Sequence, residues 1–61
     1  GEYRPHNVAE VAEGLRIEHS RFGTGTIIDI DTSQPDAKIR VKFDNVEVKT
    51  LLLKFAKFKI I

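Results

Sequence analysis

Apolar and polar residues alternate along most of this chain, with the period of a β-strand that has one buried face. The clearest example is KIRVKFD, in which Ile39, Val41 and Phe43 occupy the inward phase and basic residues the outward phase. In the last stretch, KFKII, the inward phase falls on Phe58 and Ile60. Strands are predicted at residues 15–19, 25–31, 38–44, 46–52 and 57–61.

Two further predicted strands are GTIIDID and VEVKTLL. GTIIDID places Thr26, Ile28 and Ile30 on one face and its aspartates on the other. In VEVKTLL the alternation fails near residues 50–52, so its faces stay open, and a β-bulge there is one explanation. The segment TSQPDA predicts a turn, because Ser, Pro and Asp favour turns. Asp44-Asn45 predicts a tight hairpin, since Asn tolerates the left-handed conformation.

Five short strands with turn signals between them predict an all-β fold. The apolar segment LLKFA favours a single 3₁₀ or helical turn before the last strand, which is typical of small five-stranded SH3-like barrels. We therefore predict a barrel over residues 14–61. Residues 1–13 mix Pro, Gly and charge, and we expect them to be a flexible linker, with Gly1 as an expression-tag remnant. Because methionine is absent, we expect the chain to be a piece of a longer protein.

Composition narrows the range of functions. The chain has 61 residues, no cysteine and two histidines, so no zinc cluster is expected and the core is predicted to be apolar. The absence of cysteine fits a reducing compartment. Residues 1–37 carry three basic and seven acidic side chains, whereas residues 38–61 carry seven basic and two acidic ones. A basic second half fits nucleic acid, an acidic protein surface or a solvated strand face.

The glycines in HSRFGTGTI raise the question of a phosphate site. A phosphate loop needs more residues between its glycines, a following lysine and a helix. Here the residues after Gly25 are β-branched and predict a strand. We therefore interpret Gly23 and Gly25 as structural: one takes a positive φ, or lets a neighbouring strand pass closely. Phe22 is expected to pack over this turn.

No catalytic or metal-binding constellation is recognisable. The serines have only His6 and His19 as possible bases, and no pattern brings them together. His19 is interpreted as a structural imidazole, and the paired aspartates of GTIIDID as a solvated face. The basic residues of KIRVKFD form an outward stripe that is a possible nucleic-acid contact: Lys38, Arg40 and Lys42. Aromatic residues fall at core positions rather than within the stripe, which weakens direct base stacking.

The segments GLRIEHSRFGTGTIIDID, IRVKFDN and VKTLLLKFAKFKII resemble the C-terminal, Tudor-like domain of UvrD/PcrA-type superfamily 1 ATP-dependent DNA helicases. The resemblance covers residues 14–61, although its H-x-x-F-G-x-G part also occurs in other SH3-like modules. A departure is Asn45-Val46-Glu47, where many relatives carry glycine. The matching residues are Gly14, His19, Phe22, Gly23, Gly25, Thr26, Phe43, Lys49, Leu51, Leu52, Phe55 and Ala56.

The resemblance implies a bacterial, cytoplasmic and nucleoid-associated DNA repair helicase, whose ATP and Mg²⁺ sites lie outside this segment. The segment itself is then expected to need no cofactor, to hold no metal and to be no enzyme. Implied partners are the RNA polymerase β subunit and nucleotide-excision repair proteins, with DNA possible and membrane excluded, and the isolated domain is expected to be a monomer. Residues expected to bind a partner are Lys49 above all, then Thr50, Arg21 and Lys54.

Three functional hypotheses remain open at this stage. The first is a protein-interaction module that pairs an extended acidic segment with an open barrel edge. The second is an accessory DNA-binding domain that uses the basic stripe and loses affinity steeply with salt. The third is a structural cap that has no partner of its own.

Overall fold

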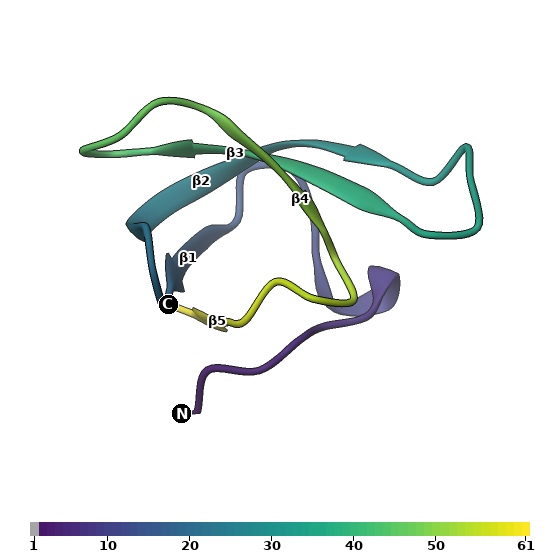
Figure 1. Ribbon diagram of the computed structural model, residues 1–61, viewed down its shortest axis with the longest axis horizontal. Coiled ribbons are helices and arrows are strands. Elements are labelled where there is room, and N and C mark those ends of the chain that lie inside the picture. The colour runs from purple at the N-terminus through teal and green to yellow at the C-terminus, as the bar shows by residue number, and fades with distance from the viewer. Residues whose placement is uncertain (1) are drawn as a thin grey trace.

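The computed structural model describes residues 2–61, which form an all-β fold as predicted. The prediction for Gly1 lies outside the described residues. All strand pairs are antiparallel, in the order β4-β3-β2-β1-β5. Figure 1 shows this sheet curling around an interior, as in a small SH3-like barrel. The elements are η1, a 3₁₀ helix (Val8–Glu10), and the strands β1 (Arg16–His19), β2 (Gly23–Asp31), β3 (Lys38–Phe43), β4 (Lys49–Leu52) and β5 (Phe58–Ile60).

The core lies inside the curled sheet and consists, within residues 2–61, of eight buried apolar residues. Burial alternates strictly along β3, so Ile39, Val41 and Phe43 face inward as predicted. Phe58 on β5 is also fully buried, whereas Ile60 is 43% exposed, contrary to expectation. Ile60 pairs with the buried Ile17 and shares its face, but it lies near the end of the barrel and lines an open hollow there. The remaining buried members are Ile27, Leu53 and Ala56.

A β-bulge in β2 overturns part of the face assignment made for GTIIDID. Ile27 is fully buried opposite Val41, while Ile28 is 38% exposed, and the register shifts between Ile27 and Asp29. The extra residue lets both Ile27 and Ile30 face the core although they are three positions apart. The prediction that Thr26, Ile28 and Ile30 share one face is therefore wrong, because Thr26 lies opposite the exposed Lys42 and Ile30 opposite the buried Ile39.

The connections around β4 also differ from the sequence prediction. β4 begins only at Lys49, so the β3–β4 connection spans residues 44–48 instead of a two-residue turn. Within residues 2–61, positive φ angles occur at glycines alone, so Asn45 does not use the left-handed conformation. β4 keeps a regular register with β3, which shows that the bulge lies in β2. After β4, the amides of Phe55 and Ala56 donate to the Leu52 carbonyl, forming the single turn predicted before the last strand.

Residues upstream of the barrel lie against β5. Arg4 and Phe58 exchange two backbone hydrogen bonds, Arg4 N to Phe58 O at 3.3 Å and Phe58 N to Arg4 O at 3.1 Å. His6 is buried and stacks on the Phe58 ring, with ring centroids 4.2 Å apart. Glu10 accepts hydrogen bonds from Arg4 and from the Asn7 amide at the start of η1. The division between linker and barrel at residues 13 and 14 stays a prediction.

Candidate functional site

The turn between β1 and β2 is held by the imidazole of His19. Its Nδ1 accepts the backbone N–H groups of Arg21, at 3.0 Å, and of Phe22, at 3.2 Å. Partial burial lowers the His19 pKa, and the nearby Arg21 charge acts in the same direction. The neutral ring with a free Nδ1 lone pair is the form that accepts these bonds. The turn therefore depends on an uncharged His19.

Gly23 and Gly25 serve this turn for different reasons. Gly23 has φ +82°, a conformation that side chains strongly disfavour, and open space surrounds its missing Cβ. Gly25 lies where the backbone of β3 crosses closely. A Cβ there would stand 2.8 Å from Phe43 Cδ1, 2.9 Å from the Lys42 carbonyl oxygen and 2.9 Å from Val41 Cγ1. Gly23 therefore allows the bend of the chain, and Gly25 allows β3 to approach β2 closely.

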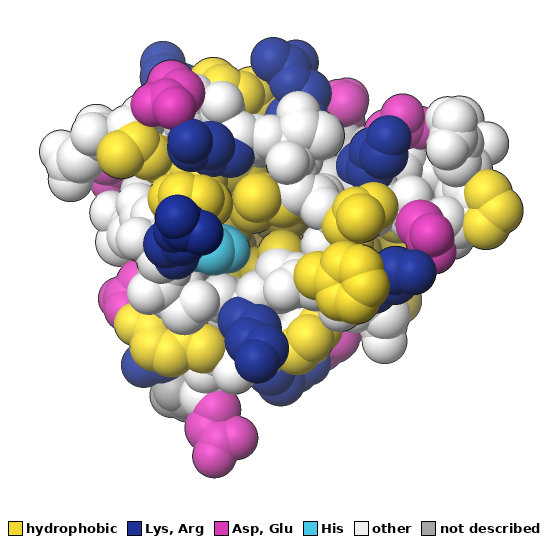
Figure 2. Space-filling view, viewed as in Figure 1, with side chains coloured by type: hydrophobic (Ala, Val, Ile, Leu, Met, Phe, Trp, Pro, Cys, Tyr) yellow, Lys and Arg dark blue, Asp and Glu magenta, His cyan; other side chains and the backbone are white. Residues whose placement is uncertain are grey.

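These constraints place Phe22 in a cluster with basic side chains. The Phe22 ring stacks on His19, with centroids 4.9 Å apart, and packs against Phe43 at 5.4 Å. Lys49 Nζ lies 4.9 Å from the Phe22 ring centroid, and Arg21 Cζ lies 5.5 Å from it. We call these five residues the Phe22 cluster. Figure 2 shows a histidine at the surface among hydrophobic and basic side chains on one face of the molecule.

Sequence reasoning named Arg21 and Lys49 separately, and the structure brings them together on one ring. Lys49 begins β4, and β4 is an edge strand whose ladder partner among residues 2–61 is β3. The cluster therefore lies beside a strand edge with backbone groups available for pairing. Thr50, the next residue of β4, is exposed and lies opposite Arg40.

Lys54 belongs to a different part of the surface. Its ammonium lies 3.2 Å from an Asp36 carboxylate oxygen and 5.0 Å from the Phe55 ring centroid. Its ion-pair and ring partners differ from those of Lys49, and it follows the opposite end of β4. The two lysines nevertheless have similar surroundings, each with one carboxylate and one aromatic ring.

The basic stripe on β3 is interleaved with carboxylates. Asp31 lies directly opposite Lys38, and Asp29 lies directly opposite Arg40, so each pair shares one face of the sheet. The Asp31 pKa is lowered mainly by hydrogen bonds from Ser33, with a smaller contribution from the Lys38 charge. Lys42 lies opposite the uncharged Thr26. Three cations and two carboxylates leave this face with little net charge to attract a phosphate backbone.

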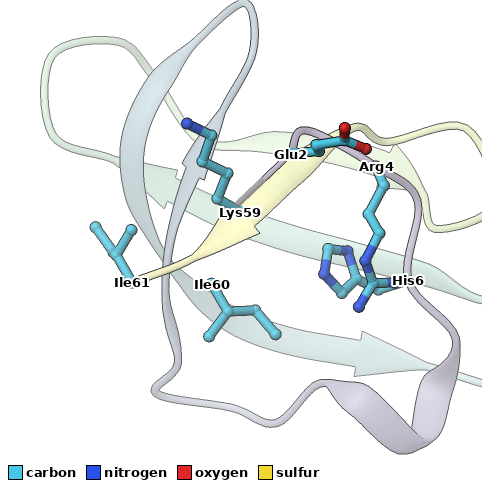
Figure 3. A pocket seen from close by; sticks show the side chains of 6 residues that line it. All are labelled: Glu2, Arg4, His6, Lys59, Ile60 and Ile61. Atoms are coloured by element: carbon cyan, nitrogen blue, oxygen red, sulfur yellow. The ribbon is translucent and has the colours of Figure 1, made fainter.

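A hollow of about 310 Å³ lies between the N-terminal segment and β5. Figure 3 shows Arg4 and His6 from the N-terminal segment on one side and Lys59, Ile60 and Ile61 from the end of the chain on the other. Both cations already have partners: Arg4 pairs with Glu10 at 2.6 Å, and Lys59 Nζ lies 4.4 Å from the Tyr3 ring centroid. The backbone pairing of Arg4 with Phe58 also covers the edge of β5 beside this hollow, whereas the outer side of β4 has no partner strand within residues 2–61, so we prefer the Phe22 cluster as the candidate site.

Several contacts at the site were missed by the sequence analysis. Glu47 pairs with Lys49, with Oε1 to Nζ at 2.8 Å. Arg16 forms a bidentate pair with Asp44, at 2.9 and 2.7 Å, and Thr24 donates to the same carboxylate at 2.8 Å. Arg16 above all, with Thr24, holds the Asp44 pKa well below its usual range. The two-residue spacing of Glu47 and Lys49 was the available signal for the first pair, whereas the second spans 28 positions and has none.

Within residues 2–61 no group of three or more His, Cys, Asp or Glu side chains is arranged to hold a metal ion. Nor does that part of the chain contain a helix with the length and apolar character of a transmembrane span.

The fold and the site define a small SH3-like β-barrel with a basic and aromatic surface beside an open strand edge. The model of the PcrA/UvrD tudor domain family matches residues 14–59. This chain belongs to that family. It is 33% identical over 46 residues to a protein described as DNA helicase II from Salmonella typhimurium. The match includes 75% of this chain and spans 6% of that relative.

Proposed function

We propose that this domain is a non-catalytic docking module of a DNA repair helicase, and that it binds an extended, acidic segment of RNA polymerase or of an excision-repair protein. The observation that carries the proposal is the position of the Phe22 cluster beside the free edge of β4. Family membership and the relative described as DNA helicase II support the helicase context. ATP and Mg²⁺ would then be bound elsewhere in the longer protein.

The open edge suits a partner that adds one strand to the sheet. Backbone N–H and C=O groups on the outer side of β4 supply affinity in such a complex, and side chains beside the edge supply specificity. Lys49 stands at the first position of β4, where its side chain is about one-third exposed. A partner strand on this edge would place its side chains next to Lys49 and Phe22.

The charge of the cluster selects an acidic partner over a basic one. Aromatic clusters often bind cations through their ring faces. In this cluster Lys49 and Arg21 already lie over the Phe22 ring, so a further cation would meet like charges. A carboxylate would meet Arg21 and Lys49 within one patch, with Lys49 paired to Glu47 in the free domain, and contacts of that kind also accelerate association.

An NMR titration of the isotopically labelled domain tests this proposal. One sample receives fragments of the RNA polymerase β subunit, and a second receives a single-stranded oligonucleotide. We expect shifts along β4 and at Arg21 and Phe22 with a polymerase fragment, at moderate salt. Lys49→Ala should remove them, and the matched variant Lys54→Ala should not. Chemical-shift changes confined to the β3 stripe, seen only with the oligonucleotide and abolished by salt, would contradict the docking proposal and support DNA binding instead.

A further inference from the structure

The cation at the centre of the Phe22 cluster already holds a carboxylate of this chain. Lys49 Nζ lies 2.8 Å from Glu47 Oε1, and Lys49 is the first cause of a lowered Glu47 pKa. Glu47 lies in the β3–β4 connection, just before the free edge begins. The Glu47 carboxylate therefore occupies the position beside Lys49 Nζ that a partner carboxylate approaching along this edge would need.

The two members of this pair are held very differently. The Lys49 side chain is 31% exposed and rests over the Phe22 ring, which stacks in turn on His19. The Glu47 side chain is 74% exposed, and it forms its ion pair with Lys49, while its own backbone amide also stabilises the carboxylate. Displacing Glu47 therefore leaves the cluster intact and returns a well-hydrated carboxylate to water, which costs little.

We infer that Glu47 is an internal stand-in for the partner's carboxylate, which must displace it from Lys49 when the partner docks. The inference rests on the proposed docking function and identifies the chemistry that the cluster recognises. In the free domain, Glu47 neutralises the Lys49 ammonium. Because a partner must displace it, segments with few carboxylates bind more weakly. Removing its charge frees Lys49 for an incoming carboxylate.

The effect is limited by the strength of an exposed ion pair. Such pairs contribute roughly 0.2–1 kcal/mol, so Glu47→Gln should tighten the binding of an acidic peptide by about 1.4- to fivefold. The chain offers a matched control at Asp36, which pairs with Lys54 at 3.2 Å beside the Phe55 ring. Asp36→Asn makes the same change in net charge at a second lysine with similar surroundings.

The test is a titration of the wild type, Glu47→Gln and Asp36→Asn with a capped peptide of alternating valine and glutamate residues. The same peptide with glutamine in place of glutamate is the second probe. We expect tighter binding of the glutamate peptide by Glu47→Gln, no change with Asp36→Asn, and much weaker binding of the glutamine peptide. Equal affinities in all three proteins, equal gains in both variants, or no binding by Glu47→Gln would overturn the inference.

A second measurement reports on the displacement directly. Lys49 keeps the Glu47 pKa below its ordinary value in the free domain. In the complex with the glutamate peptide, carboxyl NMR should show that pKa returning toward the ordinary value of about 4.3. An unchanged Glu47 titration in the complex would contradict displacement. Neither peptide experiment depends on RNA polymerase, so failure of the proposed partner and failure of this inference are distinguishable.

Discussion

Replacing Gly25 by alanine is expected to destabilise the domain more than the same replacement at Gly23, although both glycines belong to one turn motif. At Gly25 the new methyl group meets three atoms at 2.8–2.9 Å, and one of them is the Lys42 carbonyl oxygen in the backbone of β3. Side chains can rotate away, but that oxygen moves only with the strand. At Gly23 nothing lies within 4 Å, and the cost is conformational.

The magnitudes follow from these two environments. Overpacking of this kind costs about 1–3 kcal/mol, and contact with a backbone atom favours the upper part of that range. An alanine in the left-handed region costs about 1–2 kcal/mol, partly offset by a less flexible unfolded chain. Because a domain of 61 residues has a total stability of roughly 3–9 kcal/mol, either change is measurable.

Urea unfolding followed by circular dichroism measures both variants, and asparagine at each position provides the control. Asparagine tolerates the left-handed conformation, so Gly23→Asn should cost less than Gly23→Ala. Its larger side chain should make Gly25→Asn cost more than Gly25→Ala. If Gly25→Ala is no more destabilising than Gly23→Ala, or if asparagine is accepted equally at both positions, the close approach of β3 is not what requires Gly25.

Three further predictions concern the core and its ionisable groups. Phe58→Ala should lower the free energy of unfolding by about 3–5 kcal/mol, because Phe58 is fully buried. A thermal scan should then show that much of the population is unfolded. Burial above all lowers the His6 pKa, so its contribution to stability is complete above about pH 6.5 and is lost as the pH falls below it. His6→Phe should therefore flatten the dependence of unfolding free energy on pH and raise stability near pH 5, since it also removes a buried Nδ1 without a partner. Arg16→Ala should raise the Asp44 pKa toward its ordinary value in a carboxyl NMR titration, and should reduce stability at neutral pH more than in acid, where Asp44 is protonated.

Much of the fold was predictable because local signals and burial agree. The alternation in β3 matches its burial pattern at every residue, because β3 is paired along both edges and itself carries no extra residue. The bulge at Ile28 was not predictable from the pattern, because the segment Ile27-Ile28 offers apolar residues in either phase. Only the pairing with β3 decides which of the two faces the core. The long β3–β4 connection likewise depends on where pairing with β4 begins.

The candidate site shows the same limit. The motif H-x-x-F-G-x-G marked the turn, and the structure supplies a physical role for each of its residues: His19 holds the amides, Phe22 stacks, and the two glycines give a bend and a close approach. The meeting of Arg21 and Lys49 over Phe22 joins residues far apart in sequence, so periodicity alone does not reveal it.

The central claim is tested most directly by the affinity of the domain for purified bacterial RNA polymerase, compared among the wild type, Lys49→Ala and Lys54→Ala. The account predicts that Lys49→Ala weakens binding by about fivefold or more, since Lys49 is partly buried at the free edge of β4 and a desolvated charge pair contributes more than an exposed one. Lys54→Ala removes the same charge from a more exposed lysine that also has a carboxylate and an aromatic partner, and it should bind like the wild type. Equal losses in both variants, or no binding by the wild type, would contradict docking through the Phe22 cluster.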